Sequence, residues 1–318
     1  MATESRPGGL SRRRLLRLAA CAPLGALLAA CGGSRAVPRA GDAAESEPPP
    51  TSTPEPPFVV AAGEQQRLLM EASPYETPLY VFGSGLPGPV LAVLGGVHGN
   101  EPGGWMAAER VQKELRPAAG ALIVLPRANR LAIRDFVRTT DELGDLNRLY
   151  PGSPDGQPMA RMAFEIVRVF RELRASVVLD LHESWAFYRD RTETQTGTAY
   201  LGQTVSSSTP EGMALARDVV DAVNQRVQAP REELFLREWP PRGFGLGASV
   251  PGATPAAEAG TMGRGAAFGG SRSSLGLSAY VPGLTPILVE MGQQQPIERR
   301  AALHVEIVNE VARRIGLV

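Results

Sequence analysis

The chain has few histidines, few cysteines and no net charge, and each shortage excludes a class of protein. Its 318 residues include three histidines and two cysteines. Both cysteines, Cys21 and Cys31, precede the segment that can form a core, so no disulfide framework is expected there. The 33 basic and 33 acidic residues give a formal net charge of zero without a basic stripe. Nucleic acid is therefore not an expected partner.

The apolar run near the N-terminus is too short for a permanent membrane span. It extends from Leu18 to Ala30, whereas a spanning helix needs roughly 20 apolar residues. It follows Arg12-Arg13-Arg14 and ends in Leu28-Ala29-Ala30-Cys31, which resembles a twin-arginine export signal with a bacterial lipobox. We expect residues 1–31 to be a signal peptide and Cys31 to be lipidated, which predicts a membrane-anchored, extracytoplasmic lipoprotein. The alternative is an ordinary secretory signal in which Cys31 is incidental.

The next segment is rich in Pro, Ala, Ser and Glu and predicts a disordered tether over residues 32–57. Residues 58–318 have the length of one large domain or two small ones, without a break in composition. We interpret them as one catalytic domain. Within it, Gly, Ala, Pro and Ser dominate residues 240–274, which we expect to form long loops.

Short apolar runs alternate with amphipathic stretches along this domain. Nearly continuous hydrophobic runs predict strands buried on both faces, at residues 90–94, 121–125, 176–181 and 286–290. Helical spacing predicts helices at residues 104–115, 159–173, 211–227 and 296–315. This alternation predicts a three-layer α/β/α fold around a mostly parallel, mixed β-sheet.

Two of the three histidines follow such apolar runs. His98 lies in Val97-His98-Gly99-Asn100-Glu101 directly after one run, and His182 ends another. Two histidines and a carboxylate are typical protein ligands of a catalytic zinc, whose fourth position stays open. The alternatives are that Glu101 only favours a helix N-terminus and that the histidines are satisfied loop and core residues. Asp180 lies on the same strand face as His182. The two residues could therefore form a structural hydrogen-bond pair as well as part of a metal site.

Two further elements carry chemistry. Adjacent Asn147 and Arg148, after Asp145, suit a carboxylate clamp because a guanidinium matches two carboxylate oxygens. A solvated turn is the alternative for this segment. Glu290 ends an apolar strand, where a carboxylate can act as a general base, or can simply emerge into solvent.

Together the four elements resemble the zinc carboxypeptidase superfamily, and within it the succinylglutamate desuccinylase and aspartoacylase branch. The order His-Gly-Asn-Glu, Asp-Leu-Asn-Arg-x-x-Pro-Gly, Asp-Leu-His and a late Glu matches over residues 95–292. The resemblance implies one Zn²⁺ per chain, bound by His98, Glu101 and His182. It implies that Glu290 is the general base.

The resemblance also implies roles for the surrounding polar residues. Asn147 and Arg148 would hold a substrate carboxylate, and Asp145 would orient His98. The family carries an upstream arginine that stabilises the oxyanion. Its position here is Arg138 when the motifs are aligned on Asn129, and Arg134 when they are aligned on Leu125-Pro126; we favour Arg138.

The expected function is hydrolysis of an amide or peptide bond next to a free carboxylate. The substrate would be an N-acyl amino acid or the C-terminus of a peptide. The chain ends one helix after Glu290, so we expect no C-terminal β domain like that of aspartoacylases, and hence a more open site. The alternatives are a lipid-anchored zinc- or peptide-binding module without turnover, and a zinc scavenger, which the three histidines disfavour.

Overall fold

The long apolar runs form the middle of a mixed sheet in a computed structural model that describes residues 57–195, 197–238 and 272–318. All of these belong to one compact unit, Glu55–Val318. The strands are β1 Gly63–Leu69, β2 Thr77–Gly83, β3 Val90–Leu94, β4 Ala121–Leu125, β5 Val177–Ser184, β6 Ala186–Phe187, β7 Tyr200–Gly202, β8 Thr204–Ser207, β9 Phe235–Leu236 and β10 Thr285–Gly292. The α-helices are α1 Pro102–Glu114, α2 Arg130–Asp135, α3 Pro158–Glu172, α4 Pro210–Asn224 and α5 Ile297–Arg314. The 3-10 helices are η1 Leu146–Arg148, η2 Tyr188–Asp190, η3 Pro230–Glu232 and η4 Ser274–Ala279.

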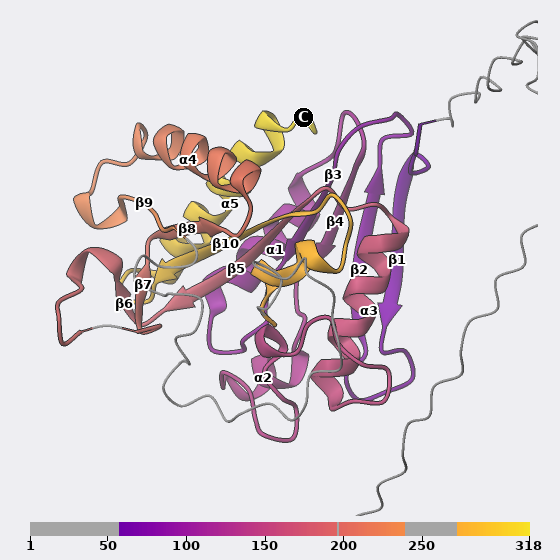
Figure 1. The fold of residues 1–318 in the computed structure, drawn as a ribbon, viewed down its shortest axis with the longest axis horizontal. Coiled ribbons are helices and arrows are strands. Elements are labelled where there is room, and N and C mark those ends of the chain that lie inside the picture. The colour runs from indigo at the N-terminus through magenta and orange to yellow at the C-terminus, as the bar shows by residue number, and fades with distance from the viewer. Residues whose placement is uncertain (1–56, 196, 239–271) are drawn as a thin grey trace, which may run out of the picture. The chain divides into compact units, whose positions relative to one another are not determined.

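The main sheet has eight strands in the order β1-β2-β4-β3-β5-β10-β8-β9 (Figure 1). Its centre is parallel, because β4, β3, β5 and β10 pair in parallel with one another in that order. Antiparallel pairs flank this centre, with β1 and β2 on one side and β8 on the other. Parallel neighbours bring the carboxyl ends of β3, β5 and β10 to one edge of the sheet, where the predicted site residues lie.

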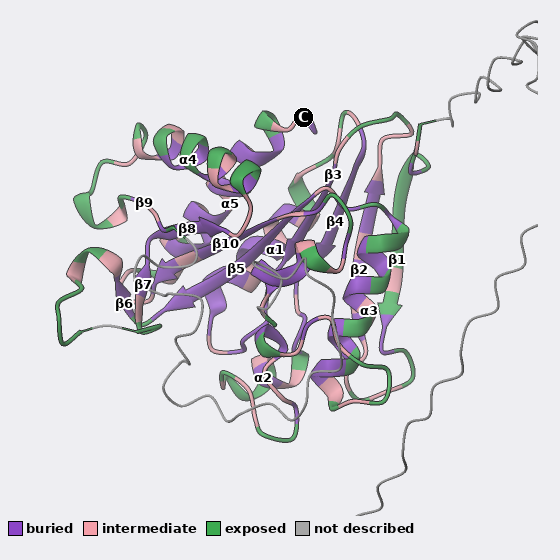
Figure 2. Ribbon diagram, viewed as in Figure 1, coloured by how far each residue is buried: buried purple, intermediate pink, exposed green. Residues whose placement is uncertain are grey.

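Helices cover both faces of the sheet. On β3, Ala92 and Leu94 pack into the core cluster that contains α3, whereas Leu91 and Val93 pack into the cluster of α1, α4 and α5. The central strands are buried throughout, while β1 at the edge is mostly exposed (Figure 2). The predicted α/β/α fold with a mostly parallel mixed sheet is confirmed.

The four predicted strands correspond to β3, β4, β5 and β10, and the four predicted helices to α1, α3, α4 and α5. The sequence interpretation missed β1, β2, β6, β7, β8, β9 and α2. All of these except β1 and β2 are six residues or shorter; β1 is mostly exposed, and β2 alternates buried with partly buried residues over part of its length. The predicted signal peptide, Cys31, nearly all of the tether and most of the loop segment 240–274 lie outside the described residues. No helix among the described residues has the length and apolar character to cross a membrane.

Candidate metal centre

The loop between β3 and α1 carries His98 and Glu101. Gly99 lets this loop approach α2 closely, since a Cβ there would lie 2.0 Å from the carbonyl of Ala132. The Gly99 N–H also donates to the carbonyl of Arg138 at 3.3 Å. Pro102 begins α1 directly after Glu101 and suits a first helical position because its missing N–H would have no helical partner. The loop is therefore fixed directly after His98 and directly after Glu101.

The strand β5 contributes His182. Alternation along the strand puts Asp180, His182 and Ser184 on the face covered by α3, because Leu179 and Leu181 pack into the opposite core. In the parallel pairing of β5 with β10, His182 lies directly beside Glu290. Cross-strand neighbours share a face, so the sheet register brings Glu290 to the same side as His182.

Three buried side chains from these elements converge. The Nδ1 atoms of His98 and His182 each lie 2.8 Å from a different carboxylate oxygen of Glu101, and 3.1 Å from each other. One ligand atom from each residue falls within 4.8 Å of the others, the one such group of three found among the described residues. Each side chain is at most 4% exposed.

Each histidine has an aspartate behind it. The Nε2 of His98 lies 3.1 Å from Asp145 Oδ1, and the Nε2 of His182 lies 2.8 Å from Asp180 Oδ2. An ionised aspartate only accepts hydrogen bonds, so each ring donates its Nε2–H outward. Both Nδ1 atoms then face Glu101 as acceptors. With both rings neutral, these three acceptors converge in a buried space where a cation could join them. This His-Glu-His group, called the metal group below, suits a single metal ion.

The electrostatic field of the group also favours a cation. Burial opposes protonation of both histidines, but acidic neighbours outweigh it: Glu101 and Asp145 raise the pKa of His98, and Asp180 and Glu101 raise the pKa of His182 well above its usual range. Burial opposes ionisation of Glu101, but the two histidines hold its pKa well below the usual range. A field that attracts protons against the effect of burial attracts a metal ion in the same way.

Glu290 lies at the edge of this group. Burial raises its pKa and the charge of Glu101 adds to the rise, while His182, Ser184 and Arg237 act in the opposite direction. The Ser184 hydroxyl donates to Glu290 Oε2 at 2.8 Å. Glu290 is therefore a partly buried carboxylate that accepts a short hydrogen bond from Ser184, and its proton affinity is higher than that of an exposed carboxylate.

The structure separates the two candidate arginines. Arg138 Nη1 lies 3.0 Å from Glu101 Oε1, and its Nη2 lies 3.5 Å from Asp145 Oδ2. Arg134 instead pairs with its neighbour Asp135 on the surface. Of the two, Arg138 is the one brought to the metal group, because the Gly99 hydrogen bond holds its backbone there.

Asn147 and Arg148 lie on η1, after the cap formed by Asp145. Asn147 is buried: its amide nitrogen lies 3.4 Å from His182 Nε2, and its carbonyl oxygen accepts from the Ser274 N–H at 2.8 Å. Arg148 is exposed and donates to the Asn147 backbone carbonyl at 2.7 Å. It forms no ion pair among the described residues, which leaves its guanidinium available to an anion.

Sequence reasoning missed three polar residues near the group. Ser184 could have been found from strand alternation, because it continues the face of Asp180 and His182. Arg237 is 8% exposed, follows β9, and donates to Ser206 Oγ at 3.3 Å. Burial lowers the pKa of Arg237, and the negative charge of Glu290 acts in the opposite direction. Glu183 faces the opposite side of β5.

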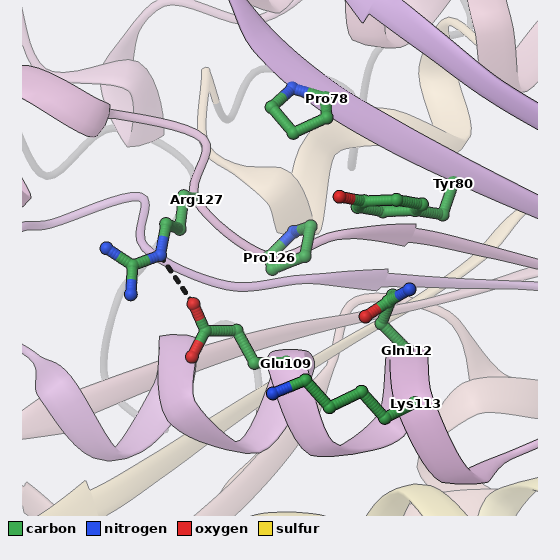
Figure 3. Close-up of a pocket in the computed structure, with 7 residues that line it drawn as sticks. All are labelled: Pro78, Tyr80, Glu109, Gln112, Lys113, Pro126 and Arg127. Carbon is green, nitrogen blue, oxygen red and sulfur yellow. Dashed lines mark hydrogen bonds and ion pairs between the residues drawn. The ribbon is translucent and has the colours of Figure 1, made fainter.

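A separate cavity of about 240 Å³ lies elsewhere, between β2, α1 and the segment after β4 (Figure 3). Its lining residues are Pro78, Tyr80, Glu109, Gln112, Lys113, Pro126 and Arg127. Arg127 and Glu109 form an ion pair there at 2.5 Å. None of the predicted site residues lines this cavity, so it is distinct from the metal group.

Comparison with known proteins supports the motif assignment over part of the chain. Residues 87–187 match the succinylglutamate desuccinylase/aspartoacylase catalytic domain. Over 98 residues the chain is 37% identical to N-alpha-acetyl-L-2,4-diaminobutyric acid deacetylase of Halomonas elongata, a match that covers 30% of this chain and 28% of that protein.

Solved structures share the fold at low sequence identity. Product-bound cell shape determinant protein Csd4 of Helicobacter pylori has a TM-score of 0.58 and 18% identity, over 73% of this chain and 52% of that one. Csd4 is a D,L-carboxypeptidase, and its solved forms include ones bound to mDAP and to a tripeptide. Succinylglutamate desuccinylase/aspartoacylase of Rhodobacter sphaeroides has a TM-score of 0.54 and 18% identity, over 81% of this chain and 66% of that one. The chain thus spans about half the length of Csd4 and less than a third of the deacetylase.

Proposed function

We propose that this chain is a metal-dependent hydrolase that cleaves an amide or peptide bond next to a free carboxylate. The observation that carries the proposal is the convergence of two imidazole nitrogens and one carboxylate beside Glu290. The match of residues 87–187 to a deacylase catalytic domain supports the same conclusion. Binding alone would not need a partly buried carboxylate at that position.

His98, Glu101 and His182 would hold one Zn²⁺ ion, with Asp145 and Asp180 fixing the two imidazole rings. When bound, zinc lowers the pKa of a coordinated water to about 7 and polarises a carbonyl oxygen. Two imidazoles and a carboxylate are ligands that zinc accepts readily, although the same donors also take other divalent metals.

Glu290 acts as the general base. It takes a proton from the attacking water and later delivers that proton to the leaving nitrogen. Its raised pKa suits the first step, because a carboxylate of higher proton affinity accepts the proton more readily. The hydrogen bond from Ser184 opposes this rise and so favours the ionised form that can accept a proton.

Arginines supply the positive charge around the reaction. Arg138, whose side chain is 46% exposed, lies beside Glu101 and stabilises the negative oxygen that forms at the scissile carbonyl. Arg148 and Asn147 hold the substrate carboxylate, and the Asn147 side chain is fixed beside Arg148 because its Oδ1 accepts from the Ser274 N–H at 2.8 Å. Fixing the carboxylate in this way places the scissile bond over the metal group.

The substrate class follows from the required carboxylate. An N-acyl amino acid and the C-terminus of a peptide both present a carboxylate next to an amide bond. The matched proteins include a deacetylase and a D,L-carboxypeptidase, so both reactions occur among them. We further propose that Cys31 is lipidated and that the domain acts outside the cytoplasm, on the basis of the N-terminal sequence pattern.

Mass spectrometry of products from a mixed substrate pool tests this function. The full chain, loaded with Zn²⁺, is incubated with N-acyl amino acids and free-carboxylate peptides, with Glu290→Gln as the matched control. Loss of single C-terminal residues identifies a carboxypeptidase, and release of free amino acids identifies a deacylase. Absence of both products, with metal bound, would contradict the proposal and favour a binding module.

A further inference from the structure

A second buried polar cluster lies behind the metal group, on the opposite face of β5. Glu183 follows His182 directly, so strand alternation turns its side chain away from the metal group and towards α1 and α5. These two helices pack against each other there (Figure 1). The side chain of Glu183 is 0% exposed and that of Arg300, on α5, is 10% exposed.

Glu183 forms three close contacts that join three elements. Its Oε2 accepts from Arg300 Nη1 at 2.6 Å, and its Oε1 accepts from the Gly103 N–H at 3.0 Å. Its own backbone N–H donates to Glu101 Oε2 at 3.0 Å. That oxygen of Glu101 is also the one that faces His182 Nδ1 at 2.8 Å. One residue therefore connects α5, the start of α1 and the carboxylate of the metal group.

The backbone is shaped for this contact. A Cβ at Gly103 would lie 2.1 Å from Glu183 Oε1 and 2.9 Å from Arg300 Cβ, so only glycine lets α1 begin this close to the pair. Gln293 ties the same loop from β10, since its side chain donates to the Asn100 carbonyl at 2.8 Å. The loop that carries Glu101 is thus held from β5, from α5 and from β10.

We infer that Glu183 and Arg300 are a positioning pair that holds Glu101 and His182 in the geometry for metal binding. The inference rests on the proposed metal centre. A buried ion pair is a weak source of stability, because desolvation of the two charges offsets their attraction, and apolar residues of similar size often serve as well. The pair instead determines position: it fixes the start of α1 against β5 so that Glu101 reaches both histidines.

The pair acts as one unit, which makes the inference testable. Glu183→Gln turns an amide N–H₂ group or a neutral oxygen towards Arg300, so the guanidinium loses its counter-charge and the start of α1 can shift. Arg300→Gln removes the same ion pair from the other side. Loss of a group that orients metal ligands typically weakens metal binding by about 10-fold to 100-fold. If both residues act through one contact, the double variant should bind Zn²⁺ as tightly as the single variant that binds it less well.

Glu310→Gln is the matched control. Glu310 is another buried acid on α5, and it pairs with arginines, including Arg226 at 3.2 Å and Arg314 at 3.0 Å, at the far end of the helix from Arg300. Its loss should lower the stability of the fold without changing the metal site.

The experiment measures the Zn²⁺ dissociation constant of each full-length variant by competition with a chromophoric chelator, together with the unfolding midpoint of the metal-free protein. The expected result is a dissociation constant raised about 10-fold or more in Glu183→Gln, Arg300→Gln and the double variant, and unchanged in Glu310→Gln. Unchanged Zn²⁺ affinity in the two single variants, with only their midpoints lowered, would overturn the inference. If Glu183→Gln does not fold, Arg300→Gln decides the same question with Glu183 in place. Failure of the wild-type chain to bind Zn²⁺ would overturn the proposed metal centre itself, and the inference with it.

Discussion

Ser184→Ala removes the hydroxyl that donates to Glu290 Oε2 at 2.8 Å. This hydrogen bond favours the ionised carboxylate and so lowers the pKa of Glu290, against the raising effect of burial and of Glu101. Without the hydroxyl, the pKa of Glu290 rises further above the ordinary value. The general base must be ionised to accept a proton, so activity is lost as the pH falls through this pKa. The acidic limb of the activity profile should therefore move to higher pH.

The magnitude follows from the strength of the bond. A hydrogen bond to a charged group contributes about 1.5–3 kcal/mol, and one pKa unit corresponds to about 1.4 kcal/mol. Ser184 is buried and Glu290 is partly buried, so solvent screens this contact only in part. We expect the acidic limb of kcat/KM to move upward by about one to two pH units in Ser184→Ala, with the plateau at higher pH retained.

The assay is a profile of kcat/KM against pH, which reports ionisations of the free enzyme. Ser207→Ala is the control, because Ser207 is equally buried but donates to the Pro286 carbonyl at 2.6 Å. Its acidic limb should match that of the wild type. An unmoved acidic limb in Ser184→Ala, or one moved to lower pH, would refute the assignment of Glu290 as the ionising base.

Three other predictions concern neighbouring residues. Arg138→Met should lower kcat/KM by about 10²-fold to 10³-fold, as for loss of an oxyanion donor, and Arg134→Met should leave it unchanged; equal effects would contradict the separation of the two arginines. Asp180→Ala should weaken Zn²⁺ binding about 10-fold or more, measured by chelator competition, because His182 loses the acceptor that orients its ring. Burial lowers the pKa of His304 from 6.5 to about 3. The folded state therefore loses stability as pH falls below 6.5, because only the unfolded chain takes up this proton. Between pH 6.5 and pH 5 the wild type should lose about 2 kcal/mol of unfolding free energy through His304, and His304→Leu should not show this loss. Urea denaturation at both pH values measures the difference.

Strands are predicted best from the sequence where burial on both faces alone determines which residues they contain. Continuous hydrophobic runs identified β3 and β5 because these strands are buried on both faces. The edge strand β1 was missed because its sequence is largely polar and exposed, and β8 because its four residues include one threonine and two serines in spite of their burial. Edge and short strands owe their conformation to pairing partners far along the chain, which local patterns do not reveal.

The same limit applies to the site. His98, Glu101, His182 and Glu290 follow apolar runs, so their common location can be predicted from the rule that functional residues gather at strand ends. The Glu183–Arg300 contact joins residues 117 positions apart and depends on how α5 packs against α1. No sequence pattern links the two residues, and only the three-dimensional structure pairs them.

The register between β5 and β10 has a consequence for how this domain tolerates change. Glu290 is paired directly with His182, so their relative position depends on the alignment of two strands and not on the segments that lead into them. Insertions before either strand can leave the two side chains together. Deletion of one residue inside either strand, at a position before the paired residue, would turn every later side chain of that strand to the other face. Such a deletion would separate the proposed base, Glu290, from the proposed metal ligand, His182, in a domain that could still be folded.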